Sequence, residues 1–208
     1  MNIAVFASGR GSNFQAILNA IHGGRLPASI SLVISNNSSA GALEIARAEG
    51  IPALHRSLRQ FPTQESFDDD LLATLQRHRV DLIALAGYMK KLSPRIISRY
   101  KNRIVNIHPA LLPAFGGEGM YGIHVHEAVL RSGAKISGVT VHLVDEEYDC
   151  GLIVAQESLR VEPADTPESL AAKVLALEHD LYPRALAAFA ENRVRIEGAI
   201  AWILPKHT

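Results

Sequence analysis

The sequence predicts an α/β fold, a Rossmann-like doubly wound sheet with a parallel N-terminal part and an antiparallel C-terminal part. Three observations support this prediction. The first half of the 208-residue chain alternates short apolar runs with amphipathic stretches, as successive strand and helix units do. The run VDLIALAG at 80–87 is apolar almost throughout, which is typical of a central strand covered on both faces. In the second half, two strand-like runs flank a turn at 148–151, and this spacing indicates a hairpin.

Each element has its own signal in the sequence. Short apolar runs predict strands, apolar residues at helical spacing predict helices, and Gly23 and Gly24 close the first helix. Ser93 and Pro94 mark another helix start, as N-cap and first-turn proline. We expect strands at 2–8, 29–36, 52–56, 80–87, 103–109, 137–147 and 151–161, with a last strand or hairpin at 193–204. We expect helices at 12–24, 40–50, 63–78, 93–100, 126–135 and 166–192, all in one domain spanning 1–208.

The composition favours a small-molecule partner. Lys plus Arg and Asp plus Glu both number 21, which gives a formal net charge of zero. Such a chain lacks the excess of positive charge that is typical of proteins that bind nucleic acid or an anionic membrane, so we expect neither partner. The single cysteine, Cys150, excludes an internal disulfide and fits a reducing compartment, and the N-terminus has no signal-peptide pattern. We therefore expect a cytoplasmic protein, as a monomer or homodimer.

A glycine-containing loop, SGRGSN at 8–13, lies between the first predicted strand and helix. In an open α/β sheet this position borders the ligand crevice. The dinucleotide fingerprint would need a glycine where Phe14 stands, and no Gly-Lys-Ser/Thr follows for a P-loop. Two interpretations stay open: a site for one phosphate at the backbone N–H groups of Gly11, Ser12 and Asn13, or a plain turn capped by Ser12.

A strand at 103–109 ends in polar residues that point to one face. Asn106 and His108 are two apart and project together, and Pro109 then stops the ladder. An amide N–H donor beside a titratable ring can polarise a carbonyl group and move a proton. Asp149, in the turn of VDEEYDCG, is the predicted partner of His108, and its charge would raise the pKa of the ring.

Other interpretations of these residues compete with the catalytic one. A strand histidine is often a hydrogen-bonded core residue. His124 and His126, with His108 and His142, can be assembled into a metal site, but no local spacing fixes such ligands, and we expect no metal. Cys150 as a nucleophile is less favoured still, because no glycine-flanked elbow surrounds it.

Several segments together resemble a known enzyme family. ASGRGSNFQAIL, LAGYMKKLSPRII, NIHPALLPAFGGEGMYGIHVHEAVL, GVTVHLVDEEYDCGLIVAQE and LEHDLYPRAL are similar, in order from residue 2 to about 190, to the phosphoribosylglycinamide formyltransferases. NIHPALLP is specific to the folate formyltransferase superfamily, and SGxGSN narrows the resemblance to this member. The resemblance implies transfer of a formyl group from 10-formyltetrahydrofolate, as co-substrate, to the amine of glycinamide ribonucleotide in purine biosynthesis.

The resemblance also implies roles for residues of this chain. Asn106 would be the oxyanion donor, His108 the general acid or base and Asp149 its partner, while His124 and His142 would surround them. The half 1–100 would bind phosphate, and the half 101–208 would hold the catalytic and folate-binding residues. The implied ribonucleotide contacts are Gly11, Ser12, Asn13 and Glu178, and the implied folate contacts are Met89, Lys90, Lys91, Leu92, Asn106 and Asp145.

This chain departs from the family pattern at three places. Gln64 stands where relatives often carry arginine, which affects a contact to the charged tail of the folate. Leu175 replaces a polar residue near the phosphate, and Arg10 or Lys173 would have to compensate. The segment FGGEGMYG at 115–122 is longer than usual, and we expect it to reshape the substrate entrance.

Three alternative functions share some of these features. A formyltetrahydrofolate hydrolase has the same Asn, His and Asp core but usually carries an extra N-terminal domain, whereas this sequence starts at the first strand. Formyltransferases for methionyl-tRNA or nucleotide sugars normally append a C-terminal domain. A protein of another class would bind phosphate through the loop and use His108 only structurally.

Overall fold

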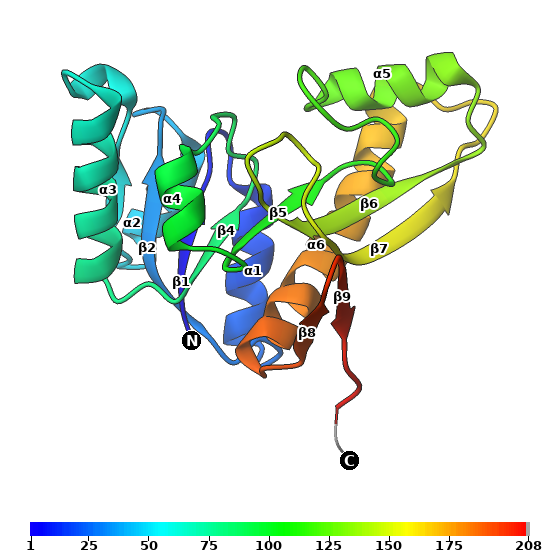
Figure 1. Ribbon diagram of the computed structural model, residues 1–208. Helices are drawn as coiled ribbons and strands as arrows, with labels where there is room; N and C mark the ends of the chain where they lie inside the picture. The colour runs from blue at the N-terminus through cyan, green and yellow to red at the C-terminus, as the bar shows by residue number, and fades with distance from the viewer. Residues whose placement is uncertain (207–208) are drawn as a thin grey trace. The chain divides into compact units, whose positions relative to one another are not determined.

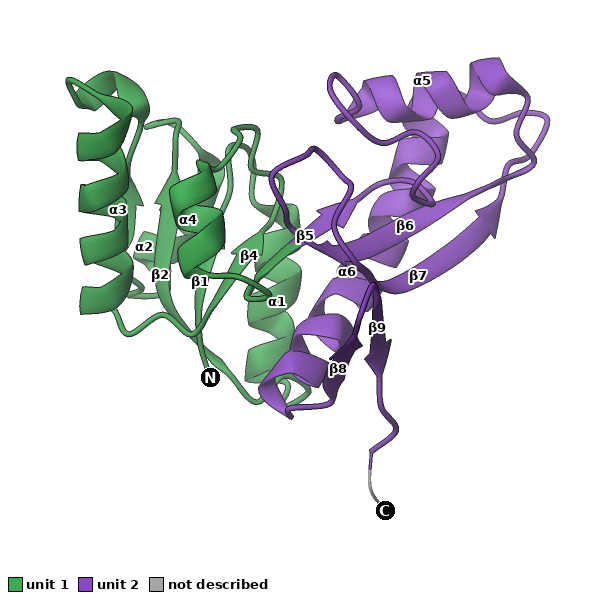
Figure 2. Cartoon of the chain, viewed as in Figure 1, with its two compact units in different colours: residues 1–105 green, residues 106–208 purple. Residues whose placement is uncertain are grey.

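The computed structural model describes residues 1–206, and its contacts divide the chain into two compact units, 1–105 and 106–208 (Figure 2). The boundary falls within the strand that carries Asn106 and His108. The prediction of a single domain stays a prediction.

Unit 1 is built from successive strand and helix units around parallel strands. The strands follow the order β3-β2-β1-β4, because β1 pairs with both β2 and β4 and β2 pairs with β3. Helices α1 and α2 cover one face and α3 and α4 the other (Figure 1), which is the doubly wound arrangement that the sequence predicts. The elements are β1 (Asn2–Phe6), α1 (Ser12–His22), β2 (Ser29–Ser35), α2 (Gly41–Ala48), β3 (Ala53–His55), η1 (Leu58–Gln60), α3 (Gln64–Arg77), β4 (Leu82–Leu85) and α4 (Pro94–Arg99).

The local sequence explains where these helices begin and what they cover. Thr63 and Ser93 are the N-caps of α3 and α4, and each side-chain oxygen accepts a hydrogen bond from the third helical residue. All four residues of β4 are buried, as expected for a strand covered on both faces. The apolar side chains of β1 are also fully buried, so the core of unit 1 lies between this sheet and its helices.

Unit 2 contains the antiparallel part. Strand β6 lies between β5 and β7 and pairs with β7 in antiparallel register, as predicted from the hairpin signal. Helix α6 packs on both β6 and β7, and α5 contacts α6. The elements are β5 (Ile104–His108), which begins in unit 1, α5 (Ile123–Ser132), β6 (Ile136–Leu143), β7 (Ile153–Arg160), α6 (Pro167–Ala190), β8 (Val194–Glu197) and β9 (Ile200–Ile203).

Two glycines let β6 and β7 approach closely. A Cβ on Gly138 would lie 2.0 Å from the Glu157 carbonyl oxygen, and one on Gly151 would lie 1.8 Å from the Leu143 carbonyl oxygen. Only hydrogen fits in these places, so glycine is needed in β6 and directly after Asp149 and Cys150 for the hairpin to close as it does.

No helix among residues 1–206 combines the length and the apolar character needed to cross a membrane.

Candidate active site

His108 is held at the tip of β5 by two partners on opposite sides of its ring. The side chain is 3% exposed. Its Nε2 lies 2.8 Å from the carbonyl oxygen of Phe115, and its Nδ1 lies 3.5 Å from Oδ2 of Asp149. A carbonyl oxygen only accepts, so Nε2 carries a proton and donates. The structure thus brings together His108 and Asp149, as the sequence predicted.

The pKa of His108 is lowered from its ordinary value. Burial is the largest cause, since it disfavours the charged ring, and the nearby His142 acts in the same direction. Asp149 and the Phe115 carbonyl both raise the pKa, but their combined effect is smaller. Asp149 thus raises the pKa of His108, as predicted, but the pKa is nevertheless lowered overall because the sequence does not reveal how deeply the ring is buried.

Asp149 presents its carboxylate to two histidines from a left-handed backbone position, with φ of 56°. Its Oδ2 accepts a hydrogen bond of 2.9 Å from the Gly117 amide, and its Oδ1 lies 3.5 Å from Nε2 of His142. Burial raises the pKa of this carboxyl group, but the His142 hydrogen bond, the His108 ring and the Gly117 amide together outweigh burial and lower it. Asp149 is thus held as a carboxylate between the two rings.

His142 links Asp149 to Asn106. It lies near the end of β6 and is 2% exposed. Its Nδ1 lies 2.8 Å from the Leu143 carbonyl oxygen, and its Nε2 lies 3.0 Å from Nδ2 of Asn106. The four side chains of Asn106, His108, His142 and Asp149 therefore form one connected polar cluster within unit 2, and we call it the Asn-His cluster.

Two further residues, which the sequence did not single out, secure the chain next to His108. The Thr140 hydroxyl donates to the Ala110 carbonyl oxygen at 2.6 Å and accepts from the Leu112 amide at 3.0 Å. The Gln156 amide donates to both the Leu112 carbonyl oxygen and the Thr140 hydroxyl. These bonds hold the start of the segment whose Phe115 carbonyl oxygen contacts His108. Alternation along β6 places Thr140 and His142 on the same face, and this signal could have identified Thr140.

The structure separates the two histidines of α5. His124 is exposed, and its Nδ1 lies 3.2 Å from Oε2 of Glu127. His126 is 4% exposed, and burial followed by the nearby His108 lowers its pKa. Residues two apart on a helix point about 200° apart, so only one of the pair faces the protein interior. The buried neighbours Val125 and Val129 indicate that this residue is His126, and the structure does not bring His124 into the Asn-His cluster.

Within residues 1–206, no group of three or more His, Cys, Asp or Glu side chains is arranged to hold a metal ion. The expectation of a reaction without metal stays a prediction.

In unit 1, the glycine loop lies beside the segment after β4. The Ser8 hydroxyl donates to Asn36 Oδ1 at 2.5 Å and accepts from the Met89 amide at 2.8 Å. Helix α1 begins at Ser12 with Gly11 as its N-cap, in left-handed conformation and without a side-chain cap. A turn capped by Ser12, one of the two open interpretations, is therefore wrong.

A close backbone approach explains the glycine at this N-cap. The φ of Gly11 is 86°, and a Cβ on it would lie 2.9 Å from Cα of Ala42. Glycine at this position therefore lets the loop before α1 lie directly against the backbone of α2.

The remaining predicted residues have the following environments. Glu178, on α6, is 9% exposed. Asp145 is exposed and accepts from the Glu147 amide. Gln64 donates to Oδ1 of Asp68 at 2.8 Å, on its own helix. Lys173 lies 2.8 Å from Oδ1 of Asp165, so its charge is already paired within α6 and its N-terminal flank, and it is a poor substitute for a phosphate contact.

The residues at 89–92 that are expected to contact folate differ in their exposure to solvent. Met89 is 51% exposed, Lys90 and Lys91 are exposed, and Leu92 is buried.

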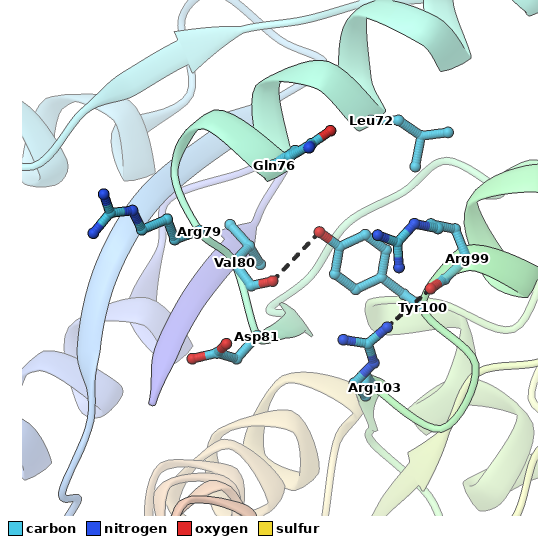
Figure 3. A pocket seen from close by; sticks show the side chains of 8 residues that line it. All are labelled: Leu72, Gln76, Arg79, Val80, Asp81, Arg99, Tyr100 and Arg103. Atoms are coloured by element: carbon cyan, nitrogen blue, oxygen red, sulfur yellow. Dashed lines mark hydrogen bonds between the residues drawn. The ribbon is translucent and has the colours of Figure 1, made fainter.

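A cavity of about 230 Å³ lies in unit 1, and none of the residues predicted for the site lines it (Figure 3). Arg99 ends α4, and the Arg103 guanidinium donates to the Arg99 carbonyl oxygen at 3.0 Å. Both guanidinium groups lie over the ring of Tyr100. Cations at a helix C-terminus offset the negative end of its dipole, so these arginines stabilise α4. The residues that line the cavity are Leu72, Gln76, Arg79, Val80, Asp81, Arg99, Tyr100 and Arg103.

The chain is similar to known proteins over most of its length. Residues 1–186 match the family described as formyl transferase. The chain is 35% identical to the phosphoribosylglycinamide formyltransferase of Escherichia coli over 203 residues, covering 98% of this chain and 93% of that protein. It is 45% identical over 194 residues to the chloroplastic phosphoribosylglycinamide formyltransferase of Arabidopsis thaliana, covering 93% of this chain but only 66% of that protein.

A solved structure shares the fold over nearly the whole chain. The glycinamide ribonucleotide transformylase 1 of Symbiobacterium toebii superposes with a TM-score of 0.92 at 41% identity, covering 99% of this chain and 94% of that one. Because the family match extends over most of the chain and a relative above 30% identity is covered almost completely, the chain belongs to the formyl transferase family.

Proposed function

We propose that this protein transfers the formyl group of 10-formyltetrahydrofolate to the amine of N1-(5-phospho-ribosyl)glycinamide. The products are formylglycinamide ribonucleotide and tetrahydrofolate, in de novo purine (IMP) biosynthesis. The observation that carries the proposal is the Asn-His cluster, in which Asp149 contacts His108 and His142 contacts Asn106. The names of the relatives support the choice of substrates.

The chemistry of formyl transfer matches these side chains. The substrate amine attacks the formyl carbon, and the carbonyl oxygen gains negative charge in a tetrahedral intermediate. An N–H of the Asn106 amide donates to this oxygen, where a preorganised donor lowers the barrier most. The bond from carbon to N10 of the folate then breaks, and a proton lost by the amine is delivered to N10. His108, paired with Asp149, is the general acid or base for this proton transfer.

The binding roles follow from the positions of the remaining residues. The uncapped N-terminus of α1, with Gly11, Ser12 and Asn13, suits the phosphate of the ribonucleotide. Glu178 would contact the ribose or glycinamide part of the ribonucleotide. His124 would lie near the catalytic residues without contacting the substrates. The proposed folate contacts are Met89, Lys90, Lys91, Leu92, Asn106 and Asp145, and the proposed setting is a cytoplasmic monomer or homodimer that needs no metal.

A turnover assay tests this function. We expect release of tetrahydrofolate when the protein is mixed with 10-formyltetrahydrofolate and glycinamide ribonucleotide, and none when the ribonucleotide is omitted. His108→Ala should lower kcat by about 10²-fold or more, because a general acid or base is lost. His22→Ala is the control, since this exposed residue at the end of α1 lies 3.5 Å from Oε2 of Glu49 and is not part of the Asn-His cluster.

Two results would contradict the proposal. Absence of turnover with both substrates would exclude formyl transfer to this acceptor. Turnover without the ribonucleotide would instead identify a formyltetrahydrofolate hydrolase.

A further inference from the structure

Ser8 lies where the glycine loop meets the segment that follows β4. Strand β1 ends at Phe6, and β4, which pairs with it in parallel, ends at Leu85. The loops after two parallel neighbours leave the same edge of the sheet, where ligands bind in open α/β folds. Ser8 therefore begins the loop proposed to bind phosphate and also faces the segment 87–92, which includes proposed folate contacts.

Two hydrogen bonds join Ser8 to this segment, and the donor of each is unambiguous. The backbone N–H of Ser8 donates to the Gly87 carbonyl oxygen at 3.0 Å. The backbone N–H of Met89 donates to the Ser8 hydroxyl oxygen at 2.8 Å. A backbone N–H can only donate, so the hydroxyl oxygen accepts here and directs its own proton to another group. That group is Oδ1 of Asn36, which lies 2.5 Å away.

The segment between β4 and α4 depends on such contacts because residues 86–93 form neither helix nor strand. Packing fixes Tyr88, whose ring lies edge to face against Phe6 with centroids 5.3 Å apart, and burial raises the pKa of its hydroxyl to about 12. Leu92 is buried at the other end. Met89 is 51% exposed, so packing holds its side chain only in part, and the Ser8 hydroxyl holds its backbone.

We propose that Ser8, although it belongs to the glycine loop, is a positioning residue for the folate side of the site. Its hydroxyl fixes the backbone of Met89 and thereby the course of the residues 90–92 that follow. This inference deepens the proposed function and rests on it for the identity of the ligand.

The phosphate-binding end of the same loop has a support of its own. The Gly9 carbonyl oxygen accepts a hydrogen bond of 3.2 Å from the Ala42 amide, and Gly11 lies directly against the backbone of Ala42. The Gln15 amide donates to the Gly11 carbonyl oxygen at 2.8 Å in the first turn of α1. None of these contacts involves the Ser8 hydroxyl. Its removal should therefore disturb the segment 89–92 and leave the N–H groups of residues 11–13 in place.

Ser8→Ala removes the hydroxyl and tests which substrate it serves. We expect KM for 10-formyltetrahydrofolate to rise by about 3-fold to 10-fold, as for the loss of one hydrogen bond, while KM for the ribonucleotide changes by less than about 2-fold. Ser39→Ala is the matched control, because the Ser39 hydroxyl also bonds to an asparagine after β2, donating to Oδ1 of Asn37 at 2.9 Å. An unchanged KM for the folate, equal rises for both substrates, or a rise confined to the ribonucleotide would overturn the proposal.

Hydrogen exchange of the Met89 amide tests the contact without any substrate. In Ser8→Ala this N–H loses its acceptor and should exchange about 3-fold to 10-fold faster, while the Ala42 amide, bonded to Gly9, should keep its rate. An unchanged Met89 rate would overturn the proposal. Faster exchange together with weaker tetrahydrofolate binding in Ser8→Ala, in a protein that transfers no formyl group, would contradict the proposed function alone.

Discussion

Two residues that contact His108 have left-handed backbone conformations that L-amino acids with side chains rarely adopt. Phe115 has φ of 57° and Asp149 has φ of 56°. Phe115 presents its carbonyl oxygen to His108, and Asp149 presents its carboxylate to the other side of the same ring. Such conformations cost about 1 to 3 kcal/mol each and persist where the surrounding structure fixes them. The backbone on both sides of His108 is therefore constrained to hold the ring.

Replacing Asp149 by Asn tests the charge that faces His108. Asparagine has nearly the same shape, and its Oδ1 can still accept from the Gly117 amide. Asp149 is the largest of the causes that raise the pKa of His108. Without its charge, burial lowers the pKa further, because only the Phe115 carbonyl still acts in the opposite direction. In Asp149→Asn, we expect the limb of the kcat/KM profile that reports His108 to move to lower pH, and kcat to fall by about 10²-fold.

The measurement is a pH–rate profile of both proteins, with a ¹⁵N titration of the His108 ring to assign the limb. A limb that stays in place, or moves to higher pH, would show that the carboxylate does not act on the ring.

At the scale of elements, the site depends on how β6 holds the segment after β5. Thr140 is fully buried in β6, and its hydroxyl bonds to Ala110 and Leu112, while Gln156 of β7 bonds to both Thr140 and Leu112. This segment leads directly to the Phe115 carbonyl oxygen. The antiparallel hairpin therefore supports the contacts of His108 as well as the core.

Thr140→Val keeps the shape of the side chain and removes its hydroxyl. The Ala110 carbonyl and the Leu112 amide then lose a buried partner, which costs about 1 to 3 kcal/mol for each group left unsatisfied. We expect lower stability in urea unfolding and a lower kcat, because the Phe115 carbonyl oxygen is less firmly placed. Thr140→Ser retains the hydroxyl and is the matched control. If the valine variant kept the stability and kcat of the serine variant, the proposed support would be wrong.

The sequence predicted most elements because each carries a local signal. Ser93 before Pro94 marked the start of α4, and the fully apolar run at 80–87 marked a central strand. Pairing Asn106 with His108 required only the alternation of a strand. Helix α5 starts at Ile123, earlier than predicted, because the segment rich in glycine before it gave no clear boundary.

Contacts between segments that are distant in the sequence could not be predicted. Gly117, in the loop 115–122, donates to Asp149, and the Phe115 carbonyl oxygen contacts His108. The sequence suggested a substrate entrance for this loop, a role that stays a prediction. Backbone groups carry no residue-specific signal, so their partners cannot be predicted from composition or spacing. The same applies to the net pKa shift of His108, which depends on burial by the whole unit.

At the scale of the whole molecule, burial of neutral histidines couples folding to pH. His108 and His126 are 3% and 4% exposed, and burial is the largest cause of the lowered pKa of each. His126 Nδ1 is also a buried atom without a hydrogen-bond partner among the described residues. As the pH falls below about 6.5, the unfolded chain takes up protons that these folded rings resist. The stability that the protein gains from keeping these rings neutral is thus fully present above that pH, and the free energy of unfolding decreases below it.

Urea unfolding at pH 7.5 and pH 5.5 tests this coupling. Each of the two rings can remove up to about 1.4 kcal/mol per pH unit between its unfolded and folded pKa, so the midpoint should be lower at pH 5.5. Asp149, whose pKa is lowered, stays ionised across this range and contributes only at more acidic pH. His126→Leu removes one titrating group from the interior and should reduce the difference between the two midpoints. Equal midpoints in the unmodified protein would show that the buried rings do not govern its acid stability.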